Sequence, residues 1–144
     1  MSAKLVLLPD SENTQLPRKA TPLSAAVDLR ARLDKPLVLL KGFGARIPTG
    51  VATRIQPGFC CLVIPRSGLG GPPHFLTIPN APGLIDQDYP GEIFVNVFLL
   101  GTKLTINPGD RIAQILCVPM VALEGHYSLA LAPRTGGAGS TGVA

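Results

Sequence analysis

Residues 93–100 read Ile-Phe-Val-Asn-Val-Phe-Leu-Leu, a run of β-branched and aromatic side chains without glycine or proline. This composition is typical of a β-strand. Residues 27–33, Val-Asp-Leu-Arg-Ala-Arg-Leu, alternate apolar and polar side chains, as a half-buried strand does. No window of a dozen residues has helical periodicity, and only a short turn of helix is expected after Ser67. The sequence therefore predicts an all-β chain.

Further strands are predicted on both sides of these two. Short strands at intervals of eight to twelve residues are typical of an antiparallel sandwich or barrel. The Asn-Pro-Gly-Asp sequence at 107–110 has proline and glycine where a β-turn places them. The other predicted strands are 4–8, 37–40, 50–55, 59–64, 75–78, 111–118 and 127–131.

The composition fits one β domain. Of the 144 residues, 16 are Gly and 15 are Pro, which disfavours a helical bundle or a coiled coil. Hydrophobic residues make up 46% and the mean hydropathy is +0.33, which argues against a disordered chain. The apolar run Leu5–Leu8 ends at Pro9 and is too short for a signal-peptide core. We expect a soluble, intracellular protein without a membrane span.

Charge is distributed unevenly along the chain. The formal net charge is +4, and most of the Lys and Arg residues lie in the first half. Because clustered basic residues with interleaved aromatics are absent, a small polyanion is a better partner than a nucleic acid. Cys60, Cys61 and Cys117 lack the spacing of a zinc site or a disulfide framework. They are interpreted as buried thiols in a reducing compartment.

Two polar segments adjoin predicted strands. Residues 65–70, Pro-Arg-Ser-Gly-Leu-Gly, form either a phosphate-binding turn, through backbone N–H groups, Arg66 and Ser67, or an ordinary strand-ending turn. In a strand-like run Asp86 and Asp88 share a face, with one as a general base and the other as its structural partner. The alternative for this second segment is a solvated acidic loop.

Two later segments are also ambiguous. Arg111 and Gln114 interrupt an apolar stretch, and Asp110 is expected to pair with Arg111 or with another residue nearby. Residues 134–142, Arg-Thr-Gly-Gly-Ala-Gly-Ser-Thr-Gly, form either a tail that wraps a phosphate chain or a disordered C-terminus.

In their order and spacing, these segments resemble the five motifs of the trimeric dUTPase family, the deoxyuridine 5'-triphosphate nucleotidohydrolases. The resemblance runs from about residue 20 to the end of the chain. It implies an antiparallel β jelly roll (the dUTPase-like β-clip) over residues 1–132, and a flexible glycine-rich tail at 133–144 that closes over the site. It also implies a homotrimer in which subunits share active sites. The matching segments are 24–29, 65–70, 83–92, 109–116 and 134–142.

The resemblance implies hydrolysis of dUTP to dUMP and pyrophosphate, with Mg²⁺ carried on the triphosphate. This reaction keeps dUTP low and supplies dUMP for thymidylate synthesis, in the cytoplasm. Asp86 is the implied catalytic residue that activates the attacking water, and Tyr89 excludes a 2′-hydroxyl. Asp28 reaches the metal only through water. The remaining implied substrate contacts are Arg66, Ser67, Gly68 and Gln114 to phosphate; Asn80, Leu84, Ile85 and Phe94 to uracil; and Arg134, Gly137, Ala138, Gly139 and Ser140 from the tail.

The tail departs from the family pattern. Ala138 stands where the family has a phenylalanine that stacks on uracil, and the spacing after Arg134 is one residue shorter. We expect weaker substrate binding with the chemistry at Asp86 retained. Two alternatives stay open: a dUTPase-derived protein-binding module with weak catalysis, and a dCTP deaminase of the same superfamily, which needs a catalytic glutamate in its pocket.

Overall fold

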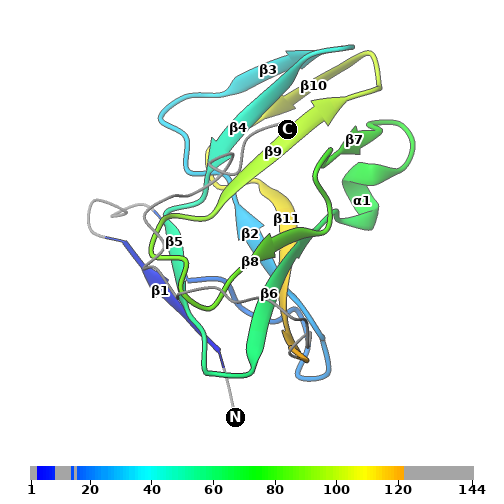
Figure 1. Ribbon diagram of the computed structural model, residues 1–144. Coiled ribbons are helices and arrows are strands. Elements are labelled where there is room, and N and C mark those ends of the chain that lie inside the picture. Colours follow the sequence, from blue (N-terminus) through cyan, green and yellow to red (C-terminus); the bar gives the residue numbers. More distant parts are fainter. Residues whose placement is uncertain (1–2, 9–13, 15, 122–144) are drawn as a thin grey trace, which may run out of the picture.

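The computed structural model describes residues 3–8, 14 and 16–121 (Figure 1). Strands dominate this part of the chain, and helix is limited to one turn, α1 (Ser67–Gly70), where the sequence predicts it. The strands are β1 (Lys4–Leu7), β2 (Val27–Arg30), β3 (Leu37–Leu40), β4 (Gly44–Pro48), β5 (Val51–Arg54), β6 (Phe59–Ile64), β7 (Leu76–Thr77), β8 (Gly83–Ile85), β9 (Phe94–Leu99), β10 (Lys103–Ile106) and β11 (Arg111–Pro119).

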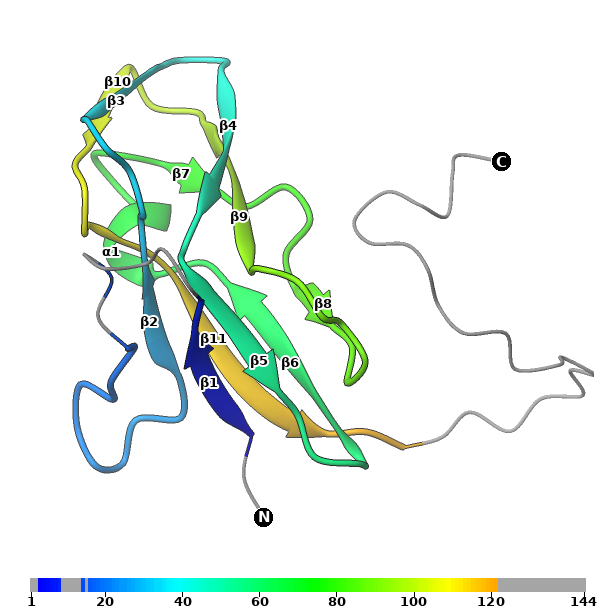
Figure 2. The ribbon, with the colours of Figure 1, turned by 90° about the vertical axis from the view of Figure 1, so that its left-hand side faces the viewer.

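The strands form antiparallel sheets, which confirms the predicted all-β architecture. The largest sheet has the order β2-β11-β6-β8, and a three-stranded sheet has the order β4-β9-β7. Strand β1 pairs with β5, and β3 pairs with β10. The four-stranded sheet lies along one side of the molecule, with β4 and β9 rising from its end (Figures 1 and 2). Neighbouring strands of the large sheet come from distant parts of the sequence.

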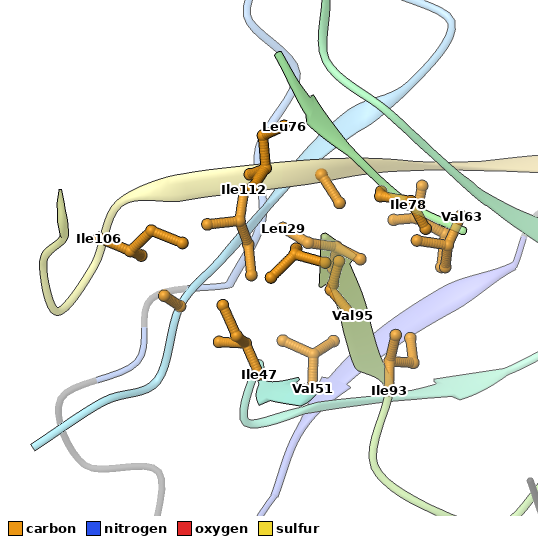
Figure 3. Close-up of a cluster of buried hydrophobic side chains, with 14 of the residues drawn as sticks. Leu29, Ile47, Val51, Val63, Leu76, Ile78, Ile93, Val95, Ile106 and Ile112 are labelled. Carbon is orange, nitrogen blue, oxygen red and sulfur yellow. The ribbon is translucent and has the colours of Figure 1, made fainter. Parts of the chain in front are cut away.

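An aliphatic core holds these sheets together. Side chains from β2, β6 and β11 point toward side chains from β4, β5 and β9 (Figure 3). Among the described residues, every fully buried side chain of the core is aliphatic apart from a cysteine and Thr49. Burial of each large aliphatic side chain stabilises the fold by about 1.5–3 kcal/mol. The central members are Leu29, Ile47, Val51, Ile93, Val95, Leu99, Ile106 and Ile112.

Most predicted strands are present, with changes at their ends. Strands β3 and β6 have the predicted bounds, and residues 93–100 supply β9. The predicted strand 27–33 stops at Arg30, because the Ala31 N–H bonds to the Asp110 carbonyl and the next N–H bonds to Pro48. The chain thus leaves the β11 ladder and crosses toward β4. The predicted strand 127–131 lies outside the described residues.

Three strands were not predicted: β4, β8 and β10. Strand β4 begins with glycine and ends with proline, so its composition resembles a loop. Pairing with β9 makes it a strand, and a Cβ on Gly44 would lie 2.7 Å from the Val97 carbonyl oxygen. Contact with a partner strand, which the sequence pattern does not reveal, therefore decides these three elements.

The predicted turn at 107–110 is confirmed. Gly109 has a φ of +83°, a conformation that glycine adopts at little cost, and the Asp110 N–H bonds to the Asn107 carbonyl. The Asp110 carboxylate accepts a hydrogen bond from the Asn107 N–H at 2.7 Å. Asp110 thus binds a nearby residue, and the alternative partner, Arg111, bonds to Asp28. The turn fixes where β11 begins.

The predicted burial of the cysteines is confirmed for two of the three and is wrong for the third. Cys60 and Cys61 are buried, but Cys117 is exposed. The reason is that β11 continues past the core, whose last member on this strand is Ile115. Within the part of the chain that the structure describes, no helix is long and apolar enough to cross a membrane.

Candidate active site

A pocket of about 130 Å³ lies between the β6–β8 pair and the β4–β9 pair. A cavity of ~150 Å³ is known to hold a benzene ring, so this pocket is the size of one six-membered ring. Its lining includes every described residue that the resemblance assigns to uracil, to deoxyribose or to the attacking water. These residues are Asn80, Leu84, Ile85, Asp86, Tyr89 and Phe94.

The pocket wall is an open strand edge. Strand β8 is the last strand of its sheet, so the backbone groups on its outer side are not used by that ladder. Gly83 lies opposite Val63, and a Cβ on this glycine would be 3.6 Å from Nδ2 of Asn80. The Asn80 amide therefore packs beside the edge of β8. An edge of this kind offers hydrogen-bond donors and acceptors in a fixed order.

Asp86 follows β8 directly and is half-buried in the pocket. The Tyr89 N–H bonds to the Asp86 carbonyl at 3.2 Å, so residues 86–89 form a turn. The predicted strand-like run, in which Asp86 and Asp88 share a face, is therefore wrong. Asp88 is exposed and does not line the pocket. Of the two aspartates, only Asp86 therefore lines the pocket.

Tyr89 is held in a fixed position. Its hydroxyl donates a hydrogen bond of 2.9 Å to the Glu92 carbonyl. Its ring also packs over Gly91, where an added Cβ would lie 2.9 Å from the hydroxyl oxygen and 3.1 Å from Cζ. The Pro-Gly sequence after Tyr89 thus gives the ring the space that it occupies.

Among the pocket residues that were not assigned from the sequence, two carry charged side chains, Glu92 and Arg46. The Glu92 carboxylate accepts a bond of 2.6 Å from the Gly50 N–H and pairs with Arg32 at 3.2 Å. The guanidinium of Arg46 lies 4.0 Å from the centre of the Phe94 ring. Glu92 belongs to the third matching segment, residues 83–92, so its position in that motif could have marked it as a site residue. Arg46 carries no such signal, because only the pairing of β4 with β9 brings it to the pocket.

The predicted phosphate residues form a second group. Gln114 lies opposite Asp28 in the β2–β11 ladder and opposite Ile64 in the β11–β6 ladder, next to the turn that carries Arg66. Nε of Arg66 lies 2.7 Å from Oδ1 of Asp28, and a nitrogen of Arg111 lies 3.2 Å from Oδ2. Arg66 also donates to the Arg111 carbonyl at 3.1 Å. Ser67 and Gly68 are exposed in α1.

The two groups do not share a pocket in the described chain. Arg66 lines a depression with Asp110 and Arg111, and Asp28 lines another with basic side chains. Neither depression shares a lining residue with the ring-sized pocket described above. The predicted tail contacts, Arg134, Gly137, Ala138, Gly139 and Ser140, lie outside the described residues.

The acidic side chains allow a test of the implied metal. Within residues 3–8, 14 and 16–121, no three His, Cys, Asp or Glu side chains are grouped as metal ligands. The carboxylate of Asp28 has about four acceptor positions, and its two ion pairs use two of them. The remaining positions suit water molecules. These residues therefore fit a metal that is held mainly by the substrate and contacts Asp28 through water.

The fold and the site define a class, an antiparallel β protein with a ring-sized pocket whose wall includes the Asp86 side chain. The sequence model of the dUTPase family matches residues 12–142. The chain therefore belongs to the dUTPase family. A deoxyuridine 5'-triphosphate nucleotidohydrolase of Paraburkholderia xenovorans is 42% identical over 147 residues, covering 99% of each chain. That of Aeromonas hydrophila is 49% identical over 108 residues, covering 74% of this chain and 70% of its own.

Solved structures agree with this assignment and with the predicted jelly roll. A mutant dUTPase from phage phi11 of S. aureus, described with a structural Mg(II) ion, has a TM-score of 0.74 at 25% identity. The match covers 94% of this chain and 99% of that one. A Staphylococcus bacteriophage 80alpha dUTPase mutant with dUpNHpp has a TM-score of 0.72 at 26% identity and covers 99% of both chains.

Proposed function

We propose that this protein hydrolyses dUTP to dUMP and pyrophosphate, with Asp86 as the general base. The observation that carries the proposal is the pocket, which collects the implied uracil, sugar and water residues around one ring-sized space. The names of the relatives support the substrate. The steps below rest on the residues of the pocket and on the family resemblance.

Uracil binds against the open edge of β8, with the Asn80 amide and the backbone near Leu84, Ile85 and Phe94 as its partners. Cytosine presents a different order of donors and acceptors and leaves these polar groups unpaired once the base covers them, which is a strong basis for rejection. The Tyr89 ring lies under the deoxyribose. Because its hydroxyl is bonded to Glu92, the ring cannot easily move aside for a 2′-hydroxyl.

Asp86 accepts a proton from a water molecule, which attacks the α-phosphorus in line with the leaving pyrophosphate. A positioned carboxylate of this kind contributes about 10²–10⁴-fold to a rate. Asp86 is half-buried at the pocket wall, next to the strand that holds the base. This placement lets one segment, β8 and the turn that follows it, bind the base and position the water.

The phosphates bind to Arg66, Ser67, Gly68 and Gln114. Mg²⁺ carried on the triphosphate would supply charge neutralisation there, and Asp28 would hold the water shell of the metal. Since these residues and the uracil pocket are separate in one chain, we infer that a complete site joins groups from different subunits of a homotrimer. The tail, residues 133–144, closes over that site and adds Arg134, Gly137, Ala138, Gly139 and Ser140.

The proposed role is to keep dUTP low and to supply dUMP for thymidylate synthesis in the cytoplasm. The bacterial relatives and the three free cysteines support this location. The dCTP deaminase alternative is disfavoured, because the glutamate that lines the pocket, Glu92, is engaged by Gly50 and Arg32.

The test is pyrophosphate release from dUTP with and without Mg²⁺, beside UTP, CTP, dCTP and dTTP, together with the molecular mass in solution. We expect Mg²⁺-dependent turnover of dUTP alone and the mass of a trimer. Asp86→Asn should lower kcat by about 10²-fold or more with the fold retained, and Asp88→Asn is the matched control. No turnover by the wild type, or equal activity of both variants, would overturn the proposal.

A further inference from the structure

Cys61 and Cys117 lie directly opposite each other in the β6–β11 ladder. In an antiparallel pair, opposite residues have Cα atoms about 4.5–5.5 Å apart, which is within the range of disulfide-bonded cysteines. Because directly opposite residues of a ladder point to the same face of the sheet, the two side chains lie next to each other. These two cysteines lie 56 positions apart in the sequence, so the fold alone brings them together.

The two thiols differ in access to solvent. Cys61 is 2% exposed and belongs to the core, whereas Cys117 is exposed. Burial raises the pKa of Cys61 to about 12, with smaller contributions from Cys117 and Cys60. A dissolved oxidant therefore meets Cys117 first, and Cys61 is the protonated neighbour directly opposite it in the ladder.

We propose that Cys61 and Cys117 form an oxidation site, which hydrogen peroxide converts into an intrachain disulfide. The Cys117 sulfur attacks one peroxide oxygen, the O–O bond breaks, and a sulfenic acid and one water form. The Cys61 sulfur then attacks the Cys117 sulfur, the S–O bond breaks, and a second water leaves with the Cys61 proton. The two thiols lose two electrons, which reduce one peroxide to two waters.

Cys60 provides a matched control within the same strand. It is adjacent to Cys61 and also buried, but successive residues of a strand point to opposite faces. Its ladder partner is Val118, so its side chain faces away from Cys117. The geometry therefore assigns the bridge to one of the two adjacent cysteines.

The site lies close to the uracil pocket. Cys61 is paired on its other side with Ile85, the residue before Asp86. Cys61 therefore lies between Cys117 on one neighbouring strand and Ile85, which lines the pocket, on the other. The oxidation chemistry itself does not depend on the proposed hydrolysis, so each can fail alone.

The experiment is peroxide treatment of the full-length protein, followed by intact-mass measurement and unreduced peptide mapping. We expect the loss of two hydrogen atoms, a cross-linked peptide joining Cys61 to Cys117, and reversal by dithiothreitol. Cys60→Ser should form the bridge as the wild type does, and Cys117→Ser should not. In Cys61→Ser, dimedone should trap about tenfold more sulfenic acid at Cys117 than in the wild type, because the resolving thiol is missing.

Three results would overturn the proposal. They are a bridge that uses Cys60, a bridge between two chains, and a wild type that keeps all three thiols or over-oxidises Cys117 without bridging. Because Cys117 is exposed, its serine variant should fold normally. Its thermal unfolding then shows whether a missing bridge reflects the chemistry or a lost fold.

Discussion

Nε of Arg66 lies 2.7 Å from Oδ1 of Asp28, so the turn after β6 is held to the middle of β2 by an ion pair. Both side chains are about one-fifth exposed, and Arg111 contacts the other oxygen of the same carboxylate. Charge-assisted hydrogen bonds of this length fix orientation as well as adding energy. Asp28 therefore positions a guanidinium that we assign to phosphate binding.

Replacing Asp28 with alanine should release Arg66 and remove the proposed contact with the metal's water shell. Loss of an outer partner of this kind usually costs about 10–100-fold in activity. We expect kcat/KM for dUTP to fall by that factor and the Mg²⁺ requirement to rise. Asp34→Ala, an exposed aspartate in the next loop, is the control. Equal kinetics for the two variants would contradict the positioning role.

The Gly91→Ala variant tests the fixed position of Tyr89. The new Cβ would lie 2.9 Å from the tyrosine hydroxyl oxygen, so the ring must shift. We expect the preference for dUTP over UTP, measured as a ratio of kcat/KM values, to fall by about tenfold, equivalent to 1.4 kcal/mol. Gly70→Ala, whose Cβ would have its nearest neighbour at 3.9 Å, should leave the ratio unchanged. An unaltered ratio in Gly91→Ala would show that Tyr89 does not set sugar specificity.

Glu92→Ala should destabilise the fold more than Arg32→Ala does. The Glu92 side chain is 13% exposed and bonds both the Gly50 N–H and Arg32, whereas Arg32 is 39% exposed. We expect a loss of about 1.5–3 kcal/mol for Glu92→Ala and of under ~1 kcal/mol for Arg32→Ala, whose pair is screened by solvent. Urea unfolding measures both values. Equal losses would mean that the ion pair, and not the bond to Gly50, is the main contribution.

Ala138→Phe restores the aromatic residue that the family places in its tail. One base–aromatic stack is worth about 1–3 kcal/mol, which corresponds to a KM for dUTP about 5- to 150-fold lower. We expect kcat to change little, because Asp86 is not altered. Ala138→Leu separates stacking from added apolar surface. A KM that does not respond to the ring would show that this tail closes by other contacts.

The raised pKa of Cys61 predicts a loss of stability at high pH. In the unfolded chain the thiol ionises near its ordinary pKa of 9.0, whereas in the fold burial keeps it neutral until about pH 12. Between these values the unfolded state has lost the proton and the folded state has not, so the free energy of unfolding falls as pH rises. We expect Tm to fall more steeply between pH 9 and 11 in the wild type than in Cys61→Val. Parallel curves would contradict this linkage.

The sequence by itself predicted most of the strands and the turn at 107–110, because these features are local. The residues that line the ring-sized pocket were named through the family resemblance and not from a local pattern. Alternation of side chains decides which face of a strand is buried, and a Pro-Gly pair decides where the chain reverses. Local patterns were less reliable where the partner strand matters, as at Gly44–Pro48, and at Asp86–Tyr89, where a turn replaces the expected strand-like run.

The tertiary structure alone decided which distant residues meet. Asp28 and Arg66, Glu92 and Gly50, and Cys61 and Cys117 are pairs of residues that are far apart in the sequence. A period-two pattern predicts which face of a strand is buried, but it does not predict which strand lies beside it or in which register the two pair. Register is set when the whole aliphatic core packs, because a slip of one residue would turn every buried side chain toward solvent.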